Sequence, residues 1–340
     1  MPRPEIFLFG ESRLDGSVAA CTRDESLESA TASTLNAILE EGPVVALVAG
    51  RLVDEDALSE IVAQGEKLSR TVELAPIGPG RDFDFLCSHL PVSLASLAMA
   101  FESRCAVLLD SARVREAGGF RDVDSTVREL IVRLSLSDSS SSALHERLGC
   151  VSSELDALPP IEADLPLVSP QWPPRSHGWL ASVLSSLQLH EVLPGVLSSV
   201  EATALHAGLW QINDWLDESH NCSQSIEGDG EGNGDYWHAI MHRREPDPSN
   251  AKYWFRRVGH HACFESLARV ADVALDESGS PKADSWKKRL GASGNWDSSA
   301  FVDFCQTSGR EGDPALAQAA RRIQWVEMLL LLVHTARAAT

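Results

Sequence analysis

The stretch Gly234–His261, "GDYWHAIMHRREPDPSNAKYWFRRVGHH", decides how the second half of this chain folds. It predicts two short helices separated by Pro246 and Pro248, because proline cannot continue a helix from its interior. Asp235 is expected to cap the first helix and Gly259 to end the second. The stretch also holds both tyrosines, two of the nine tryptophans and four of the eleven histidines. A short segment therefore concentrates side chains that commonly form binding sites.

His238 and His242 lie four residues apart on the first predicted helix. Imidazoles at this spacing share one helix face and can converge on a metal ion. Glu245 follows on the same face, where it can serve as a third ligand or as a base. The glutamate that zinc proteases carry after the first histidine is missing, so that class is not assigned. The alternative is that both histidines are hydrogen-bonded structural groups.

The preceding residues 200–224 predict one continuous amphipathic helix. Gln211, Asp214 and Glu218 are expected to face water, opposite an apolar stripe. A third stripe between these two faces follows spacings of three and four residues and consists of His206, Trp210, Asn213, Asp217, His220 and Gln224. With His220 or His206, the pair His238 and His242 can form a His/carboxylate site for Zn²⁺, Fe²⁺ or Mn²⁺.

Five cations fall within fifteen residues of the same region: Arg243, Arg244, Lys252, Arg256 and Arg257. Guanidinium groups bind carboxylates and phosphates through paired hydrogen bonds, so a pocket for an anion is expected. The alternative is internal ion pairs with Asp214, Asp217 or Glu218. The candidate ligand-binding residues are Arg243, Arg244, Arg257, Asn213, Asp217, Tyr236, Trp237 and Asn250; the candidate catalytic residues are His238, His242 and Glu245; the candidate metal ligands are His220, His238 and His242.

The first half of the chain has a different composition, because all nine tryptophans lie after residue 171. Runs such as "EIFLF", "VVALVAG", "TVELAPIG" and "CAVLLD" alternate with helical patterns, which favours an α/β layer with a mostly parallel sheet. Residues 136–178 are rich in serine and proline and are expected to form an extended connector. The predicted organisation is an α/β domain over 1–135, the connector over 136–178 and an all-α domain over 179–340.

Two segments, "VVALVAGRLVDEDALSEIV" and "CAVLLDSARVREAGGFRDVDSTVRELIVRLS", resemble the later part of family 2 glycosyltransferases of the GT-A fold. The resemblance covers residues 44–135 and is best at Arg115–Phe120 together with Arg133. It implies a truncated GT-A domain that binds a sugar nucleotide. However, Ala49, Gly50 and Arg51 stand where the family places its metal-binding carboxylates, and Thr126 and Val127 stand near its catalytic acid pair, with Glu129 a few residues late. These departures favour a degenerate domain.

A formal net charge of -20 and a pI near 4.9 exclude general nucleic-acid binding, which needs a basic surface. The longest apolar run, "VEMLLLLVH", is too short for a bilayer, and the first residues do not read as a signal peptide. Seven scattered cysteines without a CxxC pair suit reduced thiols. We therefore expect a cytoplasmic protein with neither a nucleic-acid nor a membrane partner.

Three functions are compatible with these patterns. The first is an enzyme site in the helical domain that acts on a small anionic or sugar-like compound, with a divalent metal as cofactor. The second is a ligand-binding or regulatory protein without chemistry. The third is an active glycosyltransferase with an unconventional donor site. All three leave the substrate open.

Overall fold

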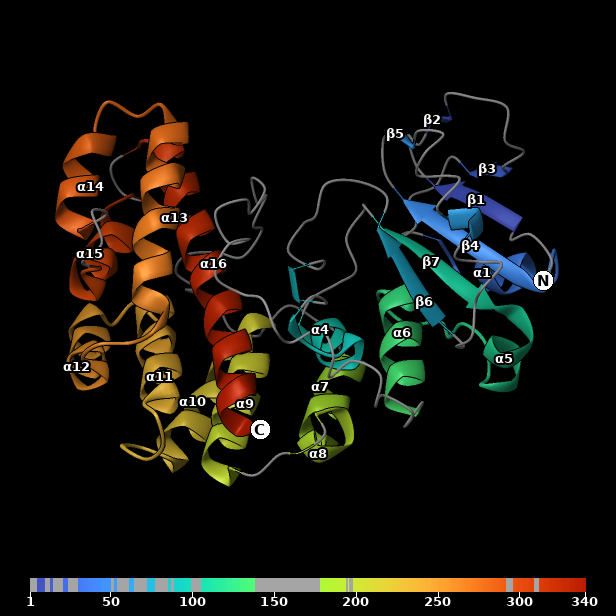
Figure 1. The fold of residues 1–340 in the computed structure, drawn as a ribbon, viewed down its shortest axis with the longest axis horizontal. Helices are drawn as coiled ribbons and strands as arrows, with labels where there is room; N and C mark the ends of the chain where they lie inside the picture. Colours follow the sequence, from blue (N-terminus) through green and yellow to red (C-terminus); the bar gives the residue numbers. More distant parts are fainter. Residues whose placement is uncertain are drawn as a thin grey trace. The chain divides into compact units, whose positions relative to one another are not determined.

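The structure, a computed structural model, describes residues 5–9, 13–14, 21–23, 30–49, 52–53, 61–63, 72–76, 85–86, 89–98, 105–137, 178–193, 195, 198–291, 296–308 and 312–340 (Figure 1). These residues fall into two compact units. The N-terminal unit comprises the described residues up to 137 and helix α7 (Gly178–Ser186). The helical unit comprises the described residues from Leu187 to Thr340.

The N-terminal unit is built on a five-stranded mixed sheet. Its strands lie in the order β3 (Cys21–Arg23), β1 (Glu5–Phe9), β4 (Val44–Ala49), β7 (Cys105–Asp110) and β6 (Val72–Pro76). Strand β1 is parallel to β3 and β4, whereas β7 is antiparallel to β4 and β6. The unit combines a sheet with helices, as the sequence predicts, and four of its five strands (β3, β1, β4 and β6) run in one direction, so the sheet is mostly parallel apart from β7. A buried apolar run such as "CAVLLD" does not reveal the direction in which its strand runs.

Four further helices belong to this unit: α1 (Ala32–Ile38), α4 (Val92–Ala98), α5 (Ser111–Glu116) and α6 (Thr126–Ser137). Short strands β2 (Arg13–Leu14) and β5 (Leu52–Val53) pair separately. The helix predicted in "DEDALSEIVAQGEKL" is described only at residues 61–63, which are helical. The rest of that prediction lies outside the described residues.

The GGF turn after α5 joins three helices. Gly118 and Gly119 adopt positive φ of 94° and 64°, which only glycine adopts without strain. Phe120 exchanges two backbone hydrogen bonds with the Asn36 side chain of α1, at 2.8 and 2.9 Å. Arg133 of α6 donates to the carbonyl of Gly119 at 2.6 Å. The residues that carry the glycosyltransferase resemblance therefore hold helices together in this chain.

Glu129 has a similar structural role. It is buried and accepts hydrogen bonds from Arg133 at 2.8 Å and from Arg121 at 3.3 Å. Glu129, the acidic residue that follows the expected catalytic position, is thus engaged in ion pairs.

The boundary between the units differs from the predicted one. Trp179 on α7 donates through its indole nitrogen to the carbonyl of Asp124 at 2.8 Å, and α7 belongs to the N-terminal unit. We had expected the all-α domain to begin at residue 179. Of the predicted connector, residues 136–137 end α6 and Gly178 begins α7; the remainder lies outside the described residues.

The helical unit contains only helices among its described regular elements, as predicted. In chain order they are α8 (Leu189–Val192), α9 (Ser199–Ile212), α10 (Leu216–Ser225), α11 (Asn233–Arg244), α12 (Pro248–Val258), α13 (Cys263–Ser278), α14 (Ala283–Leu290), α15 (Ser298–Ser308) and α16 (Pro314–Ala339). Asp313 caps α16 and Pro314 is its first residue, as the sequence indicates.

Helix α16 forms the centre of this unit and packs along α9 and α13 (Figure 1). Its middle, residues 325–333, is buried on every side, which is expected of a helix that is apolar all round. None of the helices in the described ranges is both long enough and apolar enough to cross a membrane.

The helix predicted over residues 200–224 is interrupted. Asn213, Asp214 and Trp215 separate α9 from α10, and Asp214 adopts a left-handed φ of 69°. Asp214 and Gln211 are buried, so the expectation that they face water is wrong. The break divides the predicted stripe, leaving His206 on α9 and His220 on α10.

Candidate metal centre

Helix α11 is enclosed by its neighbours. All twelve of its residues, Asn233–Arg244, are buried against α9, α10 and α12 and the surrounding helices. Its polar side chains must therefore find partners inside the protein, since a buried polar group without one is costly. The N-cap is Gly232 at φ 83° rather than the predicted Asp235, which lies one turn further inside.

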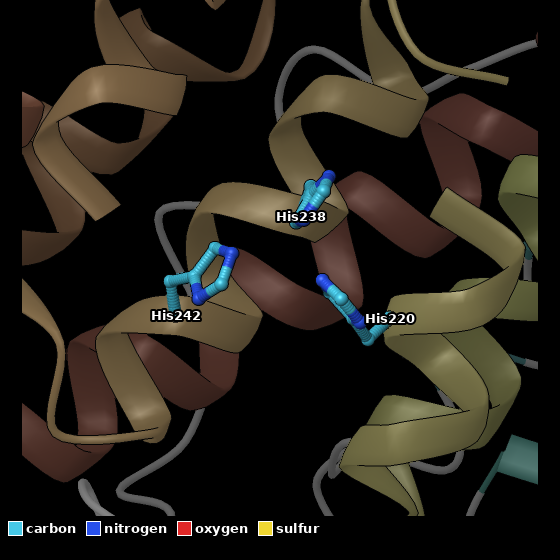
Figure 2. Close-up of side chains that lie close together, drawn as sticks. All are labelled: His220, His238 and His242. Atoms are coloured by element: carbon cyan, nitrogen blue, oxygen red, sulfur yellow. The ribbon is translucent and has the colours of Figure 1, made fainter. Parts of the chain in front are cut away.

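Three imidazoles meet between α10 and α11. Figure 2 shows His220 from α10 turned toward His238 and His242 of α11. The ring centroid of His220 lies 4.8 Å from that of His238 and 5.4 Å from that of His242. The rings of His238 and His242 are stacked, with their centroids 4.9 Å apart. One nitrogen from each ring lies within 4.8 Å of the others. Small adjustments of the rings would let all three nitrogens reach one ion at about 2.0–2.1 Å.

His238 is the most unusual member of this group. It is 1% exposed, and within the part of the chain that the structure describes neither of its ring nitrogens has a hydrogen-bond partner. The indole of Trp254 on α12 stacks on its other face at 3.9 Å. Burial, reinforced by His242 and His220, lowers the pKa of His238 to about 3. The ring is consequently neutral at pH 7, which is the form that binds metal.

His242 is held by two polar neighbours. Its Nδ1 lies 3.1 Å from a carboxylate oxygen of Glu245, and its Nε2 lies 3.0 Å from the amide nitrogen of Asn250. Burial lowers the pKa of His242, and the hydrogen bond that His242 donates to the Glu245 carboxylate partly opposes this shift. A carboxylate on Nδ1 fixes the proton there, so the lone pair of Nε2 accepts a hydrogen bond from the Asn250 amide. A metal ion on Nε2 would replace this hydrogen bond. Glu245 thus contacts His242 and, among the described residues, lies outside the group of potential metal ligands.

Arg243 is turned away from the histidines into the core. It is fully buried and forms an ion pair with Glu327 of α16, which also accepts a hydrogen bond from Tyr236 at 2.9 Å. Its guanidinium lies 4.6 Å from the ring centroid of Phe301. Burial raises the pKa of Tyr236 well above its usual value, and the Glu327 carboxylate adds to this effect. Arg243 and Tyr236 were predicted to bind a ligand; this is corrected, because both are buried, the Tyr236 hydroxyl donates to Glu327, and Arg243 pairs with Glu327 and donates to Gln324.

Arg244 is also buried and joins α11 to the end of α9. It pairs with Asp214 and donates to the carbonyl of Gln211 at 2.7 Å. The prediction that it binds an external anion is wrong, and the alternative of an internal ion pair with Asp214 is correct. The ion pair also accounts for the break after α9. Asp214, whose carboxylate pairs with Arg244, lies at this break and has a left-handed backbone conformation.

Two of the remaining cations, Arg257 and Lys252, form ion pairs near the surface. Arg257 donates to Asp235 at 3.2 Å and to Glu227 at 3.1 Å, and its guanidinium lies 4.9 Å from the Trp254 ring centroid. Lys252 donates to Asp303 at 2.6 Å. Of the arginines predicted to bind a ligand, Arg257 is the one whose charge contributes to the low pKa of His238.

The other predicted site residues are dispersed. Trp237 is buried and donates to Thr335 of α16 at 3.2 Å, and Asn213 donates to the Leu209 carbonyl at 2.8 Å. Asp217 is exposed in the first turn of α10. His206 stacks on Trp210 and is not part of the three-histidine group. Of the predicted ligand-binding residues, Asn250 is the one in direct contact with the group.

Two residues that shape the site were not singled out in the sequence. Trp254 was predicted only as an inward-facing residue of its helix, and it covers His238. Glu327 stands alone in an apolar run of α16, and a lone carboxylate in such a run signals a buried partner of opposite charge. That signal pointed to Arg243 or Arg244.

Comparisons of the chain with models of protein families, with curated proteins and with solved structures gave no match.

Proposed function

We propose that the helical unit binds one divalent transition-metal ion through His220, His238 and His242, and that the ion serves to bind or transform a small anionic or sugar-like ligand. The observation that carries this proposal is the state of His238: a buried, neutral imidazole with two unpartnered nitrogens beside two further imidazoles. A metal ion would satisfy one of these two nitrogens, because it bonds to the lone pair that no donor reaches.

Another buried histidine in the same unit supplies a comparison. His261 places Nε2 at 3.0 Å from the Asn233 side-chain oxygen and accepts on Nδ1 from the backbone nitrogen of Cys263 at 3.2 Å. That is the pattern expected of a structural histidine, with both nitrogens used. Among the described residues, His238 makes no such hydrogen bond with either nitrogen. A structural role through hydrogen bonds therefore explains the burial of His261 but not that of His238.

The donor set favours particular metals. Three imidazoles without a carboxylate suit Zn²⁺, Cu²⁺ or Ni²⁺ better than Mg²⁺ or Ca²⁺, which prefer oxygen. Of the ions considered from the sequence, Zn²⁺ fits best, because Fe²⁺ and Mn²⁺ sites usually include a carboxylate ligand. Glu245 on His242 supplies the supporting carboxylate that metal-bound histidines commonly carry.

Metal analysis of protein purified without a histidine tag tests the proposal. After dialysis against Zn²⁺ and then against buffer, we expect about one ion per chain, from the one site proposed, and its loss in the His238→Ala/His242→Ala variant. His190→Ala, a change of an exposed histidine on α8, is the matched control and should retain the ion. Equal zinc content in the double variant and the control would contradict the proposal.

The N-terminal unit keeps a separate prediction. If its resemblance to glycosyltransferases extends to function, a sugar nucleotide should raise the melting temperature of the protein. The absence of a shift with any common sugar nucleotide would favour the degenerate domain. The proposed metal site does not depend on this result.

A further inference from the structure

The coordination of the proposed ion has a consequence for its ligand. We infer that the metal keeps an exchangeable coordination position that takes a small anion directly, through an oxygen or nitrogen atom of that anion. This inference rests on the proposed metal site and adds to it the way in which a ligand is held.

The number of protein ligands indicates whether the metal has an open coordination position. Within the described residues, the group that can hold an ion contains His220, His238 and His242 and no fourth histidine, cysteine or carboxylate. Structural zinc sites are closed by four protein ligands, whereas three protein ligands leave a position for water or substrate. A three-histidine centre is therefore open by composition.

The neighbouring acidic groups are already engaged. Glu245 accepts from His242, and Asp247, whose charge also acts on His242, accepts from the backbone nitrogen of Asn250 at 3.0 Å. Moving either carboxylate onto the metal would break these hydrogen bonds. The fourth position is consequently free for an external ligand.

Charge decides what kind of ligand enters. Three neutral imidazoles contribute no negative charge, so the ion retains its full double positive charge. Of the charged side chains that act on these rings, Arg257 adds positive charge near His238 and the carboxylates of Glu245 and Asp247 add negative charge near His242. The charge of the ion itself therefore decides the attraction. The centre therefore attracts anions, even though the buried Arg243 and Arg244 cannot reach one.

The position is also reachable from the surface. His220 and Asn250 are partly exposed, whereas His238 is buried beneath Trp254. A small ligand is thus expected to approach between α10 and the start of α12. The amide nitrogen of Asn250, 3.0 Å from His242, is available there as a hydrogen-bond donor to a bound anion.

Cobalt substitution tests the inference directly. Co²⁺ is loaded into the full chain, and its visible absorption is followed while azide is added, with perchlorate at equal ionic strength as the non-coordinating control. We expect a saturable shift of the absorption bands with azide and no shift with perchlorate. The His238→Phe variant, which keeps an aromatic ring on Trp254, should lose the cobalt spectrum while retaining its helical circular dichroism.

The outcomes separate the two proposals. A cobalt spectrum that requires His238 but does not respond to azide would overturn the exchangeable position and leave the metal site intact. A cobalt spectrum that is the same in His238→Phe would overturn the metal site, and the inference with it.

Discussion

The buried polar side chains of α11 differ in whether they have partners inside the protein. On one side, Arg243 and Arg244 are buried with carboxylates supplied by Glu327 and Asp214. On the other side, His238 is equally buried, yet neither of its nitrogens has a partner among the described residues. One Arg243 nitrogen also lacks a partner there, but the Arg243 charge is paired, whereas His238 makes no hydrogen bond at all.

The difference separates stability from function. Buried charges that are paired and hydrogen-bonded hold a fold together, and loss of one partner is strongly destabilising. A buried polar group without a partner lowers stability, so its retention calls for another reason. Removing a polar group should thus have opposite effects on the two sides, and the experiments that follow test this contrast.

The largest effect is expected from Glu327→Gln. This change leaves the charge of Arg243 buried without its counterion and should lower the free energy of unfolding by about 3–5 kcal/mol. Urea unfolding followed by tryptophan fluorescence measures it, since the tryptophans lie after residue 171. Glu265→Gln, which breaks an exposed pair with Arg269, should cost less than about 1 kcal/mol. Equal losses in both variants would show that the buried pair has no special weight.

The sequence was informative where local patterns decide the structure. The Pro246 break, the Gly259 stop and the Asp313 cap were all predicted, because each depends on a residue's own backbone preferences. The pairing of His238 with His242 followed from their spacing alone. His220 was identified as a candidate third ligand from its place in the polar stripe, and the structure brings it to the other two.

The errors arose where distant residues decide. Asp214 was expected to face water, but Arg244, thirty residues away, pairs with it inside the protein. The same long-range contact interrupts the helix predicted over 200–224. Arg243 was read as an anion ligand because its counterion, Glu327, is 84 residues distant in sequence. A pattern within one segment cannot reveal which charges are buried with partners from another.

A smaller change in the free energy of unfolding is expected from lowering the pH, through the buried and hydrogen-bonded His261. Burial, with His334 and His260 nearby, lowers the pKa of His261 to about 3, below the 6.5 expected in the unfolded chain. The unfolded state then binds more protons between these values, so stability should fall as pH drops below about 6.5. This residue alone contributes up to about 1.4 kcal/mol per pH unit.

His261 has charged and titratable neighbours, and the measurement must isolate its contribution. His334 lies 4.7 Å away by ring centroid, and Asn233, which contacts His261, is bound to the buried Glu201 at 2.7 Å. In His261→Gln the pH slope of the unfolding free energy between about pH 6 and pH 4 should be shallower than in the wild type. His190→Gln, at an exposed position, should leave the slope unchanged; a slope equally steep in His261→Gln would contradict the assignment.

The smallest effect, and the one of opposite sign, is expected from His238→Phe in metal-free protein. Phenylalanine keeps the stacking on Trp254, 3.9 Å from the original ring centroid, and removes both unpartnered nitrogens. Leaving a buried polar group unsatisfied costs about 1–3 kcal/mol, so its removal should raise the free energy of unfolding by about 1–2 kcal/mol after the slightly larger ring is accommodated.

Zinc should reverse this order of stability. Wild-type protein gains about 2.7 kcal/mol when free metal is a hundredfold above its dissociation constant, whereas His238→Phe should gain little, because it has lost a ligand. The unfolding free energies of the wild type and His238→Phe are measured with Zn²⁺ and with a chelator. We expect His238→Phe to be the more stable protein in the chelator and the wild type to be the more stable one with Zn²⁺. If His238→Phe is destabilising even in the chelator, the imidazole has a structural role, and the contrast between the two sides of α11 disappears. If its rank does not change with zinc, the side of α11 that bears His238 is unpaired without being a metal site.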